Sequence, residues 1–130
     1  MLVDINGYFA PPGTGGLLFY PLPPCRVVDT RSSSGVFNGE LDVDVIGSVC
    51  GGTSAAKGYA FNATVVPPAP LLYLTLWAHG ATQPPVSTLN ANDGAITSNL
   101  AIVPTTDTKI SAYASSNTQL ILDISGYFAP

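Results

Sequence analysis

Charged side chains are scarce in this chain. Its 130 residues include four Lys and Arg and eight Asp and Glu, so 9% are charged, against roughly 25% in an average soluble protein. The four cations are Arg26, Arg31, Lys57 and Lys109, which are scattered along the chain, and the net charge is −4. A nucleic-acid surface needs clustered cations to neutralise phosphates, so this composition excludes nucleic-acid binding.

Long hydrophobic runs are also missing. The longest apolar stretch, residues 64–78, is interrupted by Pro67, Pro68 and Pro70 and is shorter than the roughly 20 residues that cross a bilayer. We therefore expect no membrane insertion. The first ten residues lack the basic and long apolar regions of a secretory signal, so an export signal would lie on a longer precursor.

Hydroxyl residues, glycine and proline take the place of charge. Ser and Thr supply 23 residues, and Gly and Pro supply another 25. A surface of hydroxyls, amides and backbone is typical of secreted all-β modules, so we expect an extracellular or cell-surface location. The length fits a single domain with its own hydrophobic core.

The two ends of the chain carry nearly the same sequence. Residues 2–11 read LVDINGYFAP and residues 121–130 read ILDISGYFAP, with seven of ten positions identical at an offset of 119. Repetition at a fixed period is typical of repeat architectures. The simplest interpretation is one module over 12–130, preceded in 1–11 by a linking or assembly strand equivalent to the end of a preceding copy.

Turn-forming clusters divide the chain into short segments with alternating apolar residues and no helical spacing. This pattern predicts an all-β fold with about nine short strands and almost no helix. We expect an antiparallel two-sheet β-sandwich, Ig-like or jelly-roll-like, in preference to a barrel, because the 12 prolines suit edges and corners. The expected strands are residues 2–9, 26–29, 41–46, 59–66, 72–77, 86–89, 96–103, 110–114 and 120–128.

A weaker repeat lies inside the module. Residues 64–67 (TVVP) followed by 73–78 resemble residues 101–104 (AIVP) followed by 109–114. Each copy reads as a strand, a turn marked by proline and a second strand. The repeat therefore predicts either two successive β-hairpins or two equivalent corners of a sandwich.

Cys25 and Cys50 are the only cysteines. Three interpretations are open: a disulfide, two buried thiols, or half of a metal site. A metal site would need histidine, and the single His79 lies far along the chain. In a module that otherwise looks secreted, we predict a Cys25–Cys50 disulfide that closes the Gly- and Ser-rich segment 32–52.

No group of residues reads as an active site. His79 has no sequence neighbour that would make it a general base, and no G-x-S-x-G elbow supplies a nucleophile. We predict that the protein is not an enzyme and has no cofactor. Asp42 and Asp44 share a strand face and would suit calcium, but no DxDxDG-type run accompanies them, so we predict no metal site.

Asp29 and Arg31 are two residues apart at the end of an expected strand. We expect a structural clasp in which Arg31 forks to a carboxylate, either Asp29 or the repeated Asp123. The alternative is recognition of an anionic sugar or carboxyl group.

Tyr73 and Trp77 are four residues apart on one strand and therefore share a face. Packing in the core is the favoured interpretation, because a β-sandwich commonly buries one Trp. The alternative is an exposed aromatic platform for sugars. Asn62 heads the only N-x-S/T sequon and is the one candidate N-glycosylation site; hydrogen bonding on the strand face is the alternative.

An ordered set of motifs resembles a family of uncharacterised exported bacterial repeat modules, common in acidobacterial-type genomes, that carry PCRxxDTR near the start and DxxGYF near the end. The resemblance covers nearly all of residues 20–130 and implies an all-β fold, tandem surface proteins and no known catalytic residues. This chain departs from the family pattern at Ser125, where Asn is usual, and in its short segment between Arg31 and Cys50. The motifs are PCRVVDTR (24–31), NATVVP (62–67), YLTLW (73–77), STLN (87–90), NLAIVP (99–104) and DISGYF (123–128).

These observations lead to one functional hypothesis and one alternative. We expect a structural subunit or repeat of an extracellular filament or stalk, whose partners are copies of itself joined head-to-tail by strand contacts. The alternative is a carbohydrate-binding or adhesin module with glycans as partners. The residues expected to form the assembly strands are Asp4, Ile5, Gly7, Tyr8, Phe9, Asp123, Ile124, Gly126, Tyr127 and Phe128.

Overall fold

The computed structural model describes residues 1, 3–5, 7–11 and 13–130. Within them it contains seven antiparallel strands and one short 3-10 helix, η1 (Thr30–Ser32). The strands are β1 (Leu18–Asp29), β2 (Phe37–Asp44), β3 (Gly58–Val66), β4 (Leu71–Ala78), β5 (Leu89–Ala91), β6 (Thr97–Pro104) and β7 (Lys109–Ala129). The all-β prediction and the near absence of helix are confirmed.

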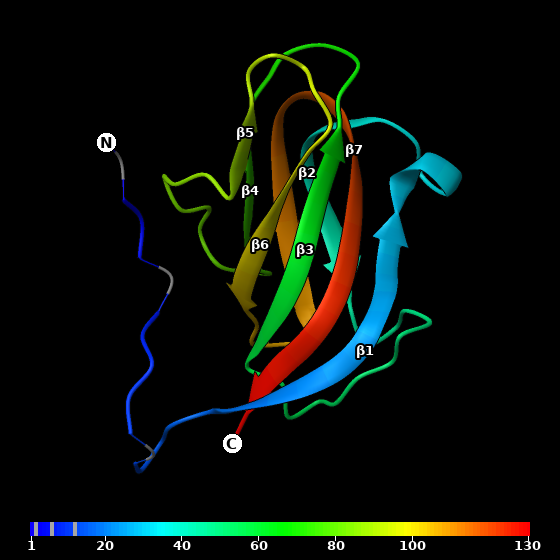
Figure 1. The fold of residues 1–130 in the computed structure, drawn as a ribbon. Helices are drawn as coiled ribbons and strands as arrows, with labels where there is room; N and C mark the ends of the chain where they lie inside the picture. The colour runs from blue at the N-terminus through cyan, green and yellow to red at the C-terminus, as the bar shows by residue number, and fades with distance from the viewer. Residues whose placement is uncertain (2, 6, 12) are drawn as a thin grey trace.

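β7 organises the sheet. The N-terminal half of this 21-residue strand pairs with β2 and β4, and its C-terminal half pairs with β1 and β3. The strand order is β5-β4-β7-β3-β6, with β1 and β2 added along β7. Figure 1 shows that these strands curl into one sheet that nearly closes into a barrel.

The structure thus has seven strands instead of nine, and it links them into one sheet instead of the expected two. The main reason is that the predicted strands 110–114 and 120–128 are a single strand. The polar residues between them stay extended because their hydroxyls find partners without a turn. Ser115 Oγ accepts a hydrogen bond from Tyr73 N (3.1 Å), and Ser116 Oγ donates one to Pro70 O (3.0 Å).

Four other strand predictions also differ from the structure. The strand expected at 41–46 is β2, which spans Phe37–Asp44. None of the described residues within 2–9 lies in a strand, although residues 2 and 6 fall outside the described part of the chain. In place of the strand expected at 86–89, the structure has β5 at Leu89–Ala91. β1 begins at Leu18 and passes through three prolines, which an edge strand tolerates by shifting register between Pro21 and Cys25.

The internal repeat marks two equivalent corners. β3 pairs with β6 and with the C-terminal half of β7, whereas β4 pairs with β5 and with the N-terminal half. The chain therefore crosses from one group of strands to the other after Val66, and it crosses in the same direction after Pro104. Neither crossing is a hairpin, so the corner interpretation is the correct one.

The core is built by alternation along the strands. In β3, Phe61, Ala63 and Val65 are fully buried, whereas Asn62 is exposed on the opposite face. A completely buried aliphatic set from the other strands surrounds them. Its largest members are Leu71, Leu74, Ile110, Leu120, Leu122 and Ile124.

Cys25 and Cys50 form the predicted disulfide. The bond connects β1 to the segment between β2 and β3, which contributes no strand. Closing a loop with a sequence separation of 25 residues stabilises the fold by about 3 kcal/mol in the chain-entropy account. The disulfide therefore holds down the part of the module with the least sheet structure.

Gly126 lets β1 approach β7 closely. A Cβ atom at Gly126 would lie 2.7 Å from Tyr20 O and would also overlap the end of the Phe19 ring. The Phe19 ring packs against Phe128 with centroids 5.0 Å apart, and Tyr20 stacks on Tyr127 at 5.1 Å. The GYF motif of β7 is therefore the contact surface for the Phe19-Tyr20 pair.

We predict that Gly126→Ala lowers the free energy of unfolding by about 1–3 kcal/mol, the usual cost of overpacking. Urea denaturation followed by tryptophan fluorescence measures this change. Gly7→Ala is the matched control, because the equivalent glycine of the N-terminal copy has nothing within 4 Å of an added Cβ. Equal losses in the two variants would contradict the packing role of Gly126.

Candidate functional site

The two copies of the repeated segment lie in opposite environments. In the C-terminal copy, Leu122 and Ile124 are 0% and 1% exposed and lie between β1 and β3. The equivalent residues of the N-terminal copy, Val3 and Ile5, are 75% and 87% exposed. The same apolar pattern thus fills the core once and faces solvent once.

The aromatic residues of the two copies differ in the same way. Tyr127 and Phe128 are half-buried against β1. Tyr8 and Phe9 are exposed, and their one described aromatic contact is between Phe9 and Phe128, with centroids 6.4 Å apart. Phe9 therefore extends the cluster of partly exposed rings where β1 begins and β7 ends.

The structure brings Asp29 and Arg31 together. Arg31 Nε and Nη2 donate to the two Asp29 carboxylate oxygens at 2.9 and 2.7 Å, and the Arg31 backbone N–H donates to Asp29 Oδ1 at 3.1 Å. The hydrogen bonds from Arg31 are the main reason that the pKa of Asp29 falls to about 2. This pair caps η1 at the end of β1.

Asp123 pairs with Arg26 rather than Arg31. Arg26 Nε and Nη2 donate to its two carboxylate oxygens at 2.8 and 3.1 Å. The two residues are cross-strand neighbours in the β1–β7 register. The sequence contained no signal for this pairing, because the partners are 97 positions apart and depend on a register that includes a bulge.

Trp77 does not form a sugar platform. It is 6% exposed, and its indole N–H donates to Ala81 O at 3.0 Å. The loop between β4 and β5 folds over this face of β4, where Thr75 Oγ1 also donates to Val86 O at 2.7 Å. The core interpretation of Trp77 is therefore correct.

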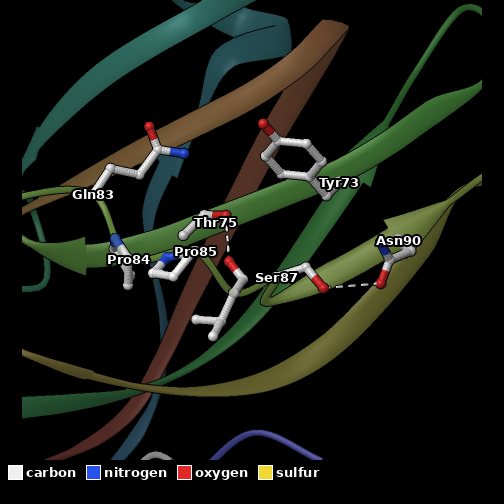
Figure 2. A pocket seen from close by; sticks show the side chains of 8 residues that line it. Tyr73, Thr75, Gln83, Pro84, Pro85, Ser87 and Asn90 are labelled. Atoms are coloured by element: carbon white, nitrogen blue, oxygen red, sulfur yellow. Dashed lines mark hydrogen bonds between the residues drawn. The ribbon is translucent and has the colours of Figure 1, made fainter. Parts of the chain in front are cut away.

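Tyr73 is half-buried and belongs to a different aromatic pair. Its ring stacks on Tyr113 of β7, with centroids 5.9 Å apart and an interplanar angle of 22°. A cavity of about 350 Å³ lies beside it, between β4 and the covering loop. Figure 2 shows the Tyr73 ring and the Gln83 and Asn90 amides around this cavity. Its lining carries no charge.

His79 has acidic neighbours that are distant in sequence. Its Nδ1 lies 2.7 Å from Asp107 Oδ2, and its Nε2 lies 3.6 Å from Asp42 Oδ2. The hydrogen bond with His79 lowers the pKa of Asp107. Asp42 in turn accepts a 2.6 Å hydrogen bond from Ser111. These contacts connect β2, β7 and the ends of β4 and β6, so the fold gives His79 acidic neighbours that the adjacent sequence does not.

The remaining candidates lie apart from these groups. Asn62 is on the exposed face of β3 and donates to Thr64 Oγ1 at 3.5 Å. Among the described residues, no cluster of three or more His, Cys, Asp or Glu side chains could hold a metal ion. No helix in the described part of the chain is long and apolar enough to span a membrane.

Comparison with known proteins finds no matching family model, curated protein or solved structure for this chain. The fold and the contacts define an antiparallel, disulfide-bonded all-β module.

The low pKa of Asp29 predicts an acid-dependent contribution to stability. Because the folded-state pKa of about 2 lies below the ordinary value of 3.8, the ion pair stabilises the fold above about pH 4, and this contribution is lost as the pH falls towards 2. Asp29→Asn should therefore lower the free energy of unfolding at pH 7, and its difference from the native chain should shrink between pH 4 and pH 2.

Urea unfolding of both chains at several pH values measures this difference. Glu40→Gln is the control for net charge, because Glu40 is exposed on β2 and forms no ion pair among the described residues. A difference for Asp29→Asn that stayed constant from pH 7 to pH 2 would count against the assignment.

Proposed function

We propose that the chain is a structural subunit or repeat of an extracellular or cell-surface filament or stalk. In this proposal, modules associate head-to-tail through β-strand contacts made by the repeated DxxGYF segment of residues 1–11. The module acts as a building unit rather than as an enzyme, and its partners are further copies of itself.

The contrast between the two copies is the main support. The C-terminal copy pairs with strands on both of its edges, so this sequence has the alternation that a strand needs. The N-terminal copy has no strand partner among the described residues. Burying each of Val3 and Ile5 would contribute about 1.5–3 kcal/mol. Natural proteins avoid leaving such a strand unpaired, and strand addition supplies it with ladder hydrogen bonds.

Charge and covalent chemistry agree with this role. With 9% charged residues, identical modules can pack closely without strong mutual repulsion. The disulfide is compatible with an oxidising, extracellular location. A contact between one end of a module and a different surface of the next is heterologous, and a heterologous contact that does not close produces a filament.

The double substitution Val3→Asp/Ile5→Asp should abolish self-association of the full chain, as should deletion of residues 1–11. Sedimentation velocity over a range of concentrations measures the assembly state. The double substitution Val36→Asp/Val49→Asp adds the same charge at two exposed sites outside the repeat and should leave assembly unchanged. The proposal fails if the chain without residues 1–11 assembles as the native chain does.

The Tyr73 cavity supports a second candidate function, the binding of a neutral saccharide. The stacked Tyr73–Tyr113 pair offers an aromatic surface, and the Gln83 amide forms no hydrogen bond to other described residues. Sugars are recognised by such combinations of ring faces and amides. In this second candidate function, Tyr73 would contact the sugar and the buried Trp77 would not.

Tyr73→Ala should weaken saccharide binding about tenfold, which corresponds to roughly 1.4 kcal/mol. A glycan array with the native chain identifies a ligand, and calorimetry then compares the variants. Leu72→Ala is the control, because Leu72 is a 63% exposed neighbour on β4 that does not line the cavity. The second candidate is rejected if no glycan binds or if the two variants lose affinity equally.

A further inference from the structure

The position that the repeated segment occupies within its own module is already filled. The C-terminal half of β7 has β1 on one side and β3 on the other. A repeated strand from a second copy must therefore either displace this half of β7 or pair with a different, open edge. The four edge strands of the sheet differ in how well they would accept it.

Three of these edges are protected in ways that natural proteins use against unwanted pairing. β1 contains three prolines without backbone N–H groups, at positions 21, 23 and 24. β2 carries the acidic residues Glu40, Asp42 and Asp44 and has a left-handed Gly39 (φ 82°). β5 is only three residues long.

The fourth edge, β6, has no such protection. Its eight residues, TSNLAIVP, contain no charged side chain and have proline only at the last position. Leu100, on β6, is 65% exposed, and Ile96, just before it, is 70% exposed. Within the described residues β6 pairs only with β3, so its other edge is free of backbone pairing.

The free edge of β6 faces an open seam in the barrel, which we call the β5–β6 seam (residues 87–90 and 97–99). A cavity of about 410 Å³ lies in this seam. In the described part of the chain, one hydrogen bond spans it, from the Asn99 side chain to Thr88 O at 2.9 Å. The β5–β6 seam therefore separates the two end strands of the β5-β4-β7-β3-β6 order.

The chain's own N-terminal segment already lies beside this seam. Asp4 lines the cavity together with residues of β5 and β6, and Figure 1 shows the segment running along the outside of the molecule on the β6 side. None of its described residues lies in a strand there, and the side chains of Val3, Ile5 and Tyr8 are exposed.

From these observations we propose that the free edge of β6, in the β5–β6 seam, is the docking site for residues 1–11 of a second copy of this chain. The inserted segment would add an eighth strand and fill the gap between β5 and β6 of the acceptor. This inference rests on the proposed function and names the acceptor surface for the assembly strand.

The alternation of the segment fits this site. In the C-terminal copy, Leu122 and Ile124 face the core while Asp123 faces outwards to Arg26. The same alternation in the seam directs Val3 and Ile5 inwards and Asp4 and Tyr8 outwards. Tyr8 can then cover exposed Leu100, and such aromatic–aliphatic cross-strand pairs stabilise a sheet.

Lysines at the edge test the acceptor surface. Ile96→Lys/Leu100→Lys places two charges where the strand would dock, on side chains whose exposure lets the fold tolerate them. Sedimentation velocity of the full chain should show a dissociation constant at least about tenfold higher. Val36→Lys/Val49→Lys adds the same charge at exposed positions away from the seam and should assemble as the native chain does.

Cross-linking shows whether the segment docks in the seam of a second chain or in the seam of its own chain. Chains with Ile5→Cys are mixed with chains carrying Ser98→Cys and treated with a short bismaleimide, which reacts with the free thiols and not with the disulfide. A cross-linked heterodimer is expected. Cross-linking only within a single chain that carries both substitutions, without dimer formation, would show that the segment closes its own seam and would overturn the proposal.

Gly7→Ala distinguishes two ways of docking: insertion in the β5–β6 seam, and replacement of the C-terminal half of β7 in the acceptor. At the position of Gly126 an added Cβ meets the Phe19 ring, so Gly7→Ala should block assembly if the segment replaces the C-terminal half of β7. Gly7→Ala should be tolerated if the segment docks in the seam, which has no such ring.

If the edge lysines leave assembly intact while Val3→Asp/Ile5→Asp abolishes it, the seam is the wrong acceptor surface and the proposed function stands. A native chain that stays monomeric at all concentrations overturns both.

Discussion

Pairing along both edges of β7 is the constraint on which the rest of the fold depends. This strand of 21 residues provides neighbours for β1, β2, β3 and β4, so most of the backbone hydrogen bonding of the sheet passes through it. Because it contributes the last strand of the module, the pairings with β1 and β2 join positions that are far apart in the sequence. Such non-local pairing makes folding slow, and the Cys25–Cys50 disulfide limits the freedom of the intervening chain.

The repeated segment shows how environment decides what a short sequence does. Leu122 and Ile124 are buried because β1 and β3 flank them, and Gly126 has no Cβ because the Phe19 ring needs that space. The N-terminal copy has Val3 and Ile5 at the equivalent positions without these neighbours, and both are exposed. The free edge of β6 is the complementary feature. β6 pairs with β3 on one side, and among the described residues its other edge has no strand partner.

Much of the fold followed from local pattern. Alternation correctly located β3, β4 and β6 to within one or two residues, and the two proline corners were visible as a repeat. Local pattern failed where partners come from distant segments. The hydroxyls of residues 115–119 read as a turn, but hydrogen bonds from β4 and to Pro70 keep them extended. Trp77 was ambiguous because its burial depends on the loop that covers it. The contacts of Arg26 and His79 join segments that are far apart in the sequence.

By itself, the sequence determined the all-β class, the faces of the main strands, the cysteine pair and the presence of two copies of one segment. These properties depend on side-chain spacing within a few residues or on simple identity between segments. Only the tertiary structure decided that one strand serves both halves of the sheet, that Arg26 holds Asp123, and that β6 is the edge left open. Each of these depends on which segments are neighbours in space, and that choice is made by the packing of the whole core rather than by any local pattern.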